Sequence, residues 1–446
     1  MPVRPRTRWL LIAIAAIFTA AALALAVRAL VNLDRYRPQV ISYLQQKLGK
    51  QVEIARLTLT FFPLSIRVDD FGVKNPPLFP PGYIAKIARV DADLDFRALL
   101  HRQVIVKSLV LVNPVIHLTS DPDGPWNFEN PNARVSQNTL PLGVIYKLQI
   151  RRGELLASNL LRSDAPGPVF FQAHDISAEL EDVNLIGIIS LSSSSASDGQ
   201  GLVRATRLRF GTVDARNFSS KFQLSPRKVL FNDAKAEVYG GGVGGALSFD
   251  LFGKNPAFTA SLRFDGIEVA HLLLAFEHAR GKMNGRMEGD LTLAGEIEHT
   301  PRPLTGMRGK GHVTVRHGEV PSLQLNANLM KLVRFNNLGP AKENPSSFNL
   351  ISTDLELANL RILCRAIDID GYGVDIDGYG SVKVDGSDEL DYQGVAQITT
   401  KQGFFTNTFA RLSGATLKDG KLSFPFRVGG TVDAPVFSKS KAARTH

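Results

Sequence analysis

Apolar and polar residues alternate in one short segment after another along most of this chain of 446 residues. Val52 and Ile54 show the pattern near the start, and Val90, Ala92 and Leu94 repeat it. A period of two puts the apolar side chains of a strand on one face, and short strands at intervals of about 8 to 12 residues are typical of all-β proteins. The sequence therefore predicts a mainly β fold: a long, curved, mostly antiparallel sheet that forms an open groove, with a few short amphipathic helices.

The alternation changes phase near Ala55. Val52 and Ile54 are separated by an even step, whereas the next apolar residues, Leu57 and Leu59, follow after an odd one. A β-bulge or a change of register returns such residues to a common face. We expect one of the two near Ala55.

An uncharged apolar run extends from Trp9 to Val27. As a helix of nineteen residues it would measure about 28 Å, which is enough to cross the hydrocarbon core of a bilayer. Three arginines precede it within the first eight residues and only Arg28 follows closely. The positive-inside rule then predicts a cytoplasmic N-terminus and an exported remainder.

A cleaved signal peptide is the alternative, because Ala20–Ala22 and Ala24–Ala26 both fit the small-x-small pattern of a cleavage site. The apolar run is, however, longer than the usual hydrophobic region of a signal peptide, and helical patterning resumes almost at once after it. These two features favour a retained membrane anchor from Trp9 to Val27.

Three later segments carry apolar residues at helical spacing. Residues 34–48 do so and are followed by Gly49, which predicts an amphipathic helix that ends at that glycine. Residues 268–280 and 323–338 show the same spacing. We expect these last two helices to cap an end of the sheet or to cover its open face rather than to bind a cofactor.

The length allows two or three domains of roughly 100 to 200 residues each. The serine-rich stretch 190–200 has the composition of a flexible linker or loop. We therefore predict a cytoplasmic tip with a transmembrane helix over 1–33, one β-domain over 34–189 and a second over 201–446. The glycines of 240–245 predict a break within the second domain.

The formal net charge of +10 permits either nucleic acid or an anionic membrane surface as a partner. Beyond the arginines beside the apolar run, Lys and Arg are scattered among Asp and Glu, with no recognition helix and no basic stripe interleaved with aromatic residues. We therefore expect a membrane partner and no nucleic acid. The single cysteine, Cys364, rules out an intramolecular disulfide and suits an oxidising compartment.

Two copies of Asp-Ile-Asp-Gly-Tyr-Gly, at 368–373 and 375–380, cluster carboxylates that would suit Ca²⁺. They lack the loop spacing of an EF-hand, and Asp alternating with Ile before Gly is also typical of a hairpin with a solvated face, which we favour. The five histidines between residues 271 and 317 form no HExxH motif. No GxSxG or GxxxxGK[ST] motif occurs. We expect no catalytic residue, no metal site, no cofactor and no enzyme activity.

Several motifs, in this order along the chain, resemble the AsmA family. In that family a membrane helix precedes a short helix that ends in Gly, then a strand, then a strand introduced by Pro. Further matches resemble its Pro-x-Ile strand with an Asp-Gly-x-x-Asn turn, its Tyr-Gly-Gly strand end and its closing Gly-Thr-x-x-x-Pro. The matching residues are 36–40, 48–54, 62–71, 109–116, 123–128, 237–241 and 429–435.

The resemblance implies a bacterial inner-membrane protein with a periplasmic β-domain and no catalytic residue. The family is related to chorein-type bridge-like lipid transfer proteins and is linked to outer-membrane assembly, protein targeting and lipid homeostasis. The partners implied are inner-membrane phospholipids and proteins of outer-membrane assembly or lipid transfer. The alternative is a scaffold that assists outer-membrane proteins and carries no lipid.

An apolar sheet face either packs into a closed core or lines a groove that acyl chains fill. Both outcomes remain open from the sequence. If the groove exists, alternation selects its lining residues, and Phe96 enters this set because it continues the alternation of Ala92 and Leu94. The candidates for contact with lipid are Ile54, Leu59, Ile66, Val68, Leu94 and Phe96.

Overall fold

The structure, a computed structural model, is mainly β, and its twenty strands are assigned to a single sheet accompanied by few helices. This confirms the predicted mainly β fold with few helices. From β1 to β6 and from β9 to β20 the strand pairs are antiparallel, except for the parallel pair of β4 with β5. The described residues are 33–61, 64–101, 105–121, 126–128, 145–160, 166–183, 199–225, 228–250, 257–276, 279–296, 306–332, 346–399, 415–419 and 421–440.

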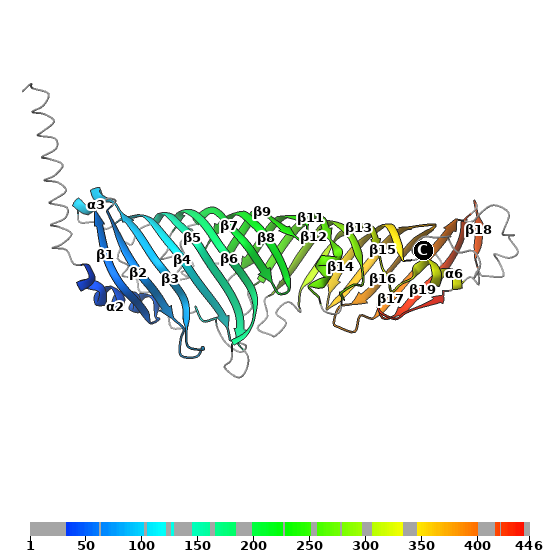
Figure 1. Ribbon diagram of the computed structural model, residues 1–446, viewed down its shortest axis with the longest axis horizontal. Coiled ribbons are helices and arrows are strands. Elements are labelled where there is room, and N and C mark those ends of the chain that lie inside the picture. Colours follow the sequence, from blue (N-terminus) through cyan, green and yellow to red (C-terminus); the bar gives the residue numbers. More distant parts are fainter. Residues whose placement is uncertain are drawn as a thin grey trace, which may run out of the picture. The chain divides into compact units, whose positions relative to one another are not determined.

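The chain divides into two compact units, each shown in Figure 1. The described residues up to Thr206, with Phe222–Arg227, form the N-terminal unit, and Arg207–Lys221 with the residues from Lys228 onward form the C-terminal unit. The linker predicted at 190–200 lies largely outside the described residues, and its last two residues begin β7. The strands that lie wholly in the N-terminal unit are β1 (Val52–Phe61), β2 (Leu64–Lys74), β3 (Tyr83–Leu94), β4 (Val106–Ser120), β5 (Ile145–Leu160) and β6 (Pro166–Val183).

Two strands have residues in both units, and the rest of the sheet belongs to the C-terminal unit. The shared strands are β7 (Gly199–Phe210) and β8 (Val213–Leu224). The strands of the C-terminal unit are β9 (Lys228–Val238), β10 (Gly241–Asp250), β11 (Ala257–Glu268), β12 (Asn284–Glu296), β13 (Arg308–Glu319), β14 (Ser347–Ala358), β15 (Arg361–Gly371), β16 (Val374–Lys383), β17 (Leu390–Thr399), β18 (Thr416–Lys418), β19 (Lys421–Gly430) and β20 (Pro435–Lys439).

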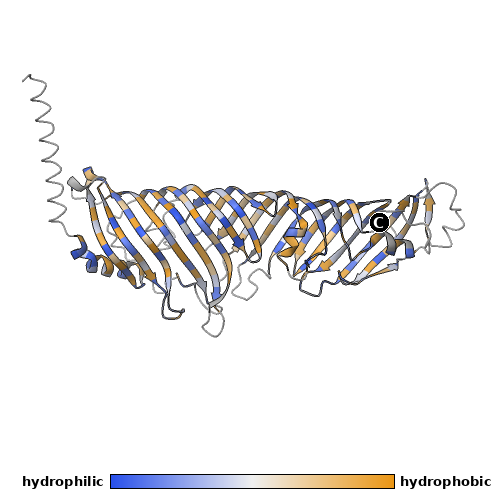
Figure 2. Cartoon of the chain, in the orientation of Figure 1, coloured by the Kyte–Doolittle hydropathy of each residue, from blue (hydrophilic) through white to orange (hydrophobic). Residues whose placement is uncertain are grey.

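Within each unit the strands pair mostly in chain order. In the C-terminal unit β9 to β17 form one ladder that continues to β19. The other edge of β19 pairs with β18 along its first residues and with β20 along its last ones. Figure 2 shows apolar and polar residues alternating along these strands, as a sheet with one apolar face requires.

The helices are short and lie at the ends of strands. The predicted helix over 34–48 is a 3-10 turn, η1 (Leu33–Tyr36), followed by α2 (Arg37–Leu48), and Gly49 ends it with a φ of 62° and an N–H bond to the carbonyl of Gln45. The later predicted helices are shorter than expected: α5 (Val269–Leu274) and α6 (Leu325–Leu332). Residues 333–338 lie outside the described part.

No helix among the described residues is long and apolar enough to span a bilayer. The apolar run from Trp9 to Val27 lies outside the described residues, so its predicted role as a membrane anchor stays a prediction.

The glycine-rich stretch 240–245 is not the break that we predicted. Only Tyr239 and Gly240, with φ values of 45° and 84°, form a turn, and the following glycines belong to β10. The strand needs glycine there, because a Cβ atom on Gly245 would lie 2.0 Å from the carbonyl oxygen of Ser261. The Tyr239 hydroxyl also accepts a bond from the backbone N–H of Asp214, which ties this turn to the start of β8.

Asn127 is a fully buried polar side chain beside the parallel strand pair of the N-terminal unit. Asn127 is 0% exposed and follows β4. Its Oδ1 accepts the backbone N–H of Thr119, and its Nδ2 donates to the carbonyl of His117 and to Oδ1 of Asn75. The Nζ of Lys50, just after α2, donates to its backbone carbonyl. Asn127, the asparagine of the Asp-Gly-x-x-Asn motif, therefore connects three segments of the unit.

We expect replacement of Asn127 by alanine to lower the free energy of unfolding by at least about 2 kcal/mol, because buried partners lose their hydrogen bonds. The measurement is the thermal unfolding of the purified full chain. Asn349→Ala is the matched control, since that amide is exposed and bonds only weakly to Asp370. Equal unfolding temperatures for the two variants would contradict this role of Asn127.

Candidate functional site

Apolar side chains of the N-terminal unit form two rows that cross the strands from β1 to β6. Cross-strand neighbours on one face of a sheet lie about 4.5 to 5.5 Å apart, so each row is continuous. Most of these side chains are only partly buried. One row consists of Leu57, Val68, Val90, Leu111, Ile150 and Ala178, and the other of Leu59, Ile66, Ala92, Leu109, Leu148 and Leu180. We call these twelve residues the apolar band.

A line of irregular residues crosses the same strands beside the band. The ladder between β1 and β2 skips the pair of Ala55 and Asp70, and the φ of Asp70 is 53°. Asn113 in β4, Arg152 in β5 and Asp175 in β6 have φ values of 52°, 55° and 52°. Residues in this left-handed conformation are typical of bulges, and Asn and Asp tolerate it better than most. The irregularity predicted near Ala55 is thus confirmed as one of a series.

Across this line the apolar positions of a strand change between odd and even residue numbers. This change keeps the apolar side chains on one face of the sheet. In β4 the apolar positions Leu109 and Leu111 are odd-numbered, whereas beyond Asn113 they are Ile116 and Leu118. Ile116 pairs with Ala85 of β3 and with Leu155 of β5, so the apolar face continues on the far side of the line.

The opposite face of the N-terminal unit is charged. Arg67 Nε lies 2.6 Å from Oδ1 of Asp91, and Arg89 Nε lies 3.0 Å from the other oxygen of that carboxylate. Lys147 forms an ion pair with Glu179, and its hydrogen bond lowers the pKa of the Glu179 carboxyl. Such pairs contribute little to stability, but they keep this face hydrated. These charges distinguish this face from the one that carries the apolar band.

Five of the six predicted lipid-contacting residues lie on strands of this unit. Ile54 is buried at 7% exposure against α2, while Leu59, Ile66, Val68 and Leu94 are partly buried. Leu59, Ile66 and Val68 belong to the apolar band.

The strand placement of Phe96 was wrong. β3 ends at Leu94, and Phe96 begins the short helix α3 (Phe96–Leu100), where its side chain is 60% exposed. Asp95 explains the end of the strand, because its carboxylate accepts the N–H groups of Arg97 and Ala98 and so caps a helical turn. The proposed anchor residues Trp9 and Val27 lie outside the described residues.

Helix α2 covers the apolar face at the β1 end of the band. Its apolar side chains pack on Val52, Ile54 and Leu57, and they are Val40, Ile41, Leu44 and Leu48. Side chains from η1 and α2 also bond to the backbone of β1: Asp34 accepts the N–H of Leu57, and Gln45 donates to the carbonyl of Val52. These bonds occupy groups that could otherwise pair with another strand.

The C-terminal unit holds an apolar cavity of about 280 Å³. Its walls come from three places. Val320 and Leu323 precede α6, and Ile367 lies in β15. Leu390 begins β17, and Val432 lies between β19 and β20. Sequence reasoning missed these residues, since their alternation alone did not show that distant connections close over the face. In the same cavity, burial raises the pKa of Tyr392, which therefore stays neutral.

Gly378 forms part of the floor of this cavity. Gly378 of β16 pairs with Gly394 of β17, and Gly378 also pairs with Ile367. A Cβ atom on Gly394 would lie 2.7 Å from the carbonyl oxygen of Asp377, and one on Gly378 would lie 2.7 Å from that of Gln393. Glycine therefore permits a close approach of backbone here and leaves space above the sheet.

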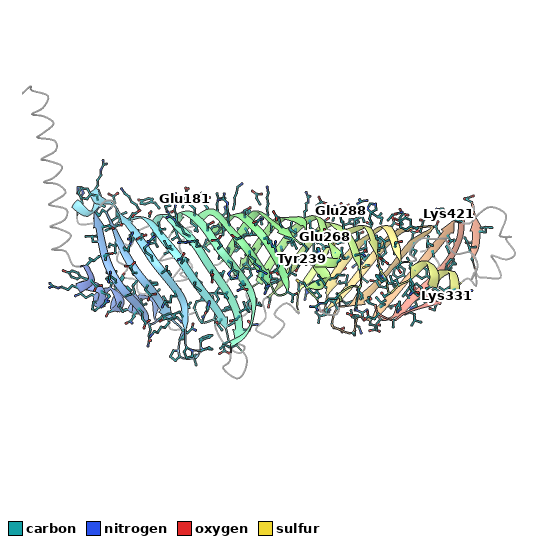
Figure 3. All side chains as sticks on the ribbon, viewed as in Figure 1. Glu181, Tyr239, Glu268, Glu288, Lys331 and Lys421 are labelled. Carbon is teal, nitrogen blue, oxygen red and sulfur yellow. The ribbon has the colours of Figure 1, made fainter. Side chains whose placement is uncertain are left out.

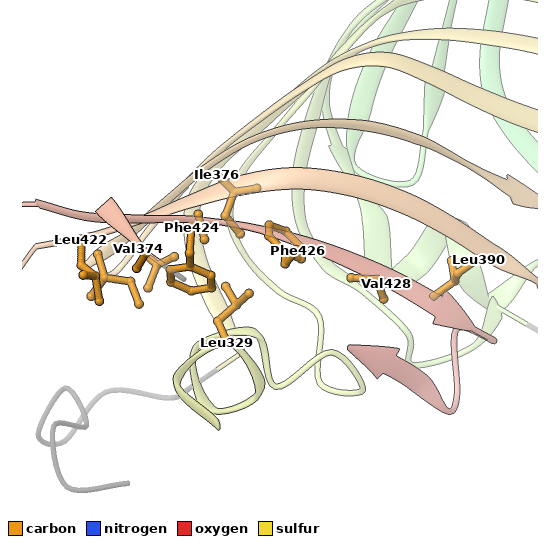
Figure 4. Packing of buried hydrophobic residues seen from close by; sticks show 11 residues of the cluster. Leu329, Val374, Ile376, Leu390, Leu422, Phe424, Phe426 and Val428 are labelled. Carbon is orange, nitrogen blue, oxygen red and sulfur yellow. The ribbon is translucent and has the colours of Figure 1, made fainter. Parts of the chain in front are cut away.

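Helix α6 covers the apolar face next to the cavity. Leu329 is fully buried and points from α6 toward Phe424 and Val374, as Figure 4 shows. Ile376 and Phe426 extend this cluster and also line the cavity. Helix α5 packs similarly on Val315 and Phe348. Both helices therefore cover the face of the sheet, as predicted.

The aspartate repeats form the predicted hairpin. β15 and β16 are joined by a two-residue turn, with Asp368 opposite Asp377 and Asp370 opposite Asp375. Lys421 lies 3.0 Å from Asp375 and is labelled in Figure 3, together with Glu288, which pairs with Arg316 at 2.8 Å. Among the described residues no group of three or more His, Cys, Asp or Glu side chains could hold a metal ion.

A sheet with an apolar face, partly covered by short helices, defines this chain as a β-rich protein. Residues 4–145 match the model of the AsmA family. The match confirms the resemblance carried by the earlier motifs, while those at 237–241 and 429–435 lie beyond it. It supports a general connection with the outer membrane. No curated protein matches the chain.

We expect Gly394→Ala to lower the free energy of unfolding by about 1 to 3 kcal/mol, because the added methyl group meets neighbouring backbone. Thermal unfolding of the full chain measures this. Gly242→Ala is the matched control, since a Cβ atom there has no other atom within 4 Å. An unchanged unfolding temperature for Gly394→Ala would show that this approach is not a constraint.

Proposed function

We propose that this protein holds or passes phospholipid acyl chains along the apolar face of its sheet and acts in outer-membrane biogenesis and lipid homeostasis. The observation that carries the proposal is the apolar band, which crosses six strands without a charged residue. Soluble proteins rarely leave so continuous an apolar surface partly exposed unless it binds something.

The energetics of such binding do not require specific contacts. Burial of hydrocarbon is worth roughly 0.8 kcal/mol per CH₂, or on the order of 12 kcal/mol for a chain of sixteen carbons before the cost of ordering it. Apolar side chains of no particular identity are sufficient, which agrees with the mixture of Leu, Ile, Val and Ala in the band. The charged opposite face would keep the protein hydrated while lipid occupies the groove.

The proposed location is the periplasmic side of the bacterial inner membrane, with the run from Trp9 to Val27 as a single-pass anchor. This rests on the distribution of arginines around that run and on the AsmA match. The proposed partners are inner-membrane phospholipids and proteins of outer-membrane assembly or lipid transfer.

We expect Ile150→Asp to reduce the phospholipid that copurifies with the full chain at least about fivefold, because a carboxylate in the band must be desolvated when lipid binds. Extraction followed by mass spectrometry measures the lipid. Gln149→Asp adds the same charge one residue away on the opposite face and should retain the lipid of the unmodified protein.

A protein that contains no phospholipid, or that keeps it in both variants, would contradict the proposal. The first result would favour the alternative, an assembly or targeting factor for outer-membrane proteins. The packed cluster around Leu329 is the observation that favours this alternative, because it shows that part of the apolar face is closed by protein.

Topology can be tested with a membrane-impermeant maleimide. In a Cys364→Ala background, Lys421→Cys places a thiol at a side chain that is 45% exposed. We expect it to react in spheroplasts, whereas Arg4→Cys should react only after the membrane is permeabilised. Reaction of Arg4→Cys alone in intact spheroplasts would reverse the proposed orientation.

A further inference from the structure

An unusual ion pair lies beside the cavity of the C-terminal unit. The Nζ atom of Lys282 lies 2.6 Å from Oδ2 of Asp388 and 3.4 Å from Oδ2 of Asp433. Lys282 is only 15% exposed, the lowest value for any ion-paired side chain of the described residues. Burial disfavours its charged form, but the hydrogen bond and charge of Asp388, joined by those of Asp433, outweigh burial and raise the pKa of Lys282.

The three residues come from opposite edges of the sheet, where an edge means the row of strand ends and connections on one side. Lys282 lies in the connection between β11 and β12, whereas Asp388 lies between β16 and β17 and Asp433 between β19 and β20. Every strand pair from β11 to β17, and the pairs of β19 with β17 and β20, are antiparallel. The first connection is therefore at one edge and the other two are at the opposite edge. The ion triad joins the two edges.

The apolar cavity lies between these same edges. Val320 and Leu323 reach it from the connection of β13 with β14, on the edge of Lys282, and Val432 reaches it from the other edge. The backbone N–H of Val432 donates to the carbonyl of Asp388 over 3.1 Å. The two acidic loops are thus tied together, and the residue next to Asp433 lines the cavity.

The geometry points to a gate: Lys282, Asp388 and Asp433 hold the two edges of the sheet together over the cavity, and their separation admits or releases a phospholipid acyl chain. This inference rests on the proposed function, since it takes hydrocarbon as the occupant. The apolar walls of the cavity suit hydrocarbon. A buried ion pair also suits a gate, because its partners regain hydration when the edges separate, which offsets part of the lost attraction.

The experiment uses the full chain in lipid nanodiscs, with a photo-crosslinking amino acid in place of Ile367 in the cavity or, in a second protein, of Ile150 in the apolar band. The rate at which deuterated phospholipid replaces unlabelled phospholipid in the crosslinked adduct is read by mass spectrometry. We expect Lys282→Met to speed exchange at position 367 at least about tenfold and to leave position 150 unchanged.

Two variants distinguish opening of the gate from a general loss of stability as the cause of faster exchange. The charge-swapped pair Lys282→Glu with Asp388→Lys should restore slow exchange, since the introduced ammonium group would then lie between two carboxylates. Lys421→Met is the matched control, because it removes an exposed ion pair of the same unit. A third protein has cysteines in place of Lys282 and Asp388, on a Cys364→Ala background, joined by a cleavable bismaleimide. Exchange at position 367 should stop until the linker is cleaved.

The outcomes distinguish this inference from the proposed function. Adducts at both positions, with exchange at 367 unaffected by Lys282→Met and by the linker, would overturn the gate and leave lipid binding intact. Adducts at 150 but none at 367 in any variant would also overturn the gate, because the cavity would hold no lipid. Absence of adducts at both positions would overturn the proposed function itself.

Discussion

The burial of apolar side chains that all face one way is the interaction on which the rest of this structure depends. A strand with one apolar face must cover that face with a second layer or with a ligand. Here the covering layer is incomplete: α2 packs on the first strands of the N-terminal unit, and α5 and α6 pack on parts of the C-terminal unit. Elsewhere in each unit the face is partly exposed or borders a cavity, and under the proposed function hydrocarbon would occupy these places without any specific recognition group.

Backbone irregularities keep that face continuous. The left-handed residues Asp70, Asn113, Arg152 and Asp175 follow one another across neighbouring strands and shift the parity of the apolar positions in each. In the C-terminal unit, glycines such as Gly394 allow backbone to approach where any Cβ atom would collide. Bulges and glycines are the usual means by which sheets acquire local twist and bending. The amino acids that shape the apolar face are thus polar or small residues.

The sequence predicted the strands, the helix that ends at Gly49 and the bulge near Ala55, because each leaves a local pattern of apolar residues, glycine or phase. It failed at Phe96, where the carboxylate of Asp95 starts a helical turn that apolar alternation cannot reveal. It also failed at 240–245, where glycines serve close packing between strands instead of a break. The cavity could not be predicted, because Val320 and Val432 are more than a hundred residues apart and meet only through the pairing of intervening strands. Lys282 gave no signal either, since a single lysine acquires meaning only from the two aspartates beside it.

Acyl chains that contact one face of the strands would be detected by a photo-crosslinking scan along β4. We expect phospholipid adducts at positions 109, 111, 116 and 118 but none at 108, 110, 115 and 117, so that the period of two changes phase at Asn113. Adducts at every position, at none, or with an unbroken period of two through Asn113 would contradict this expectation.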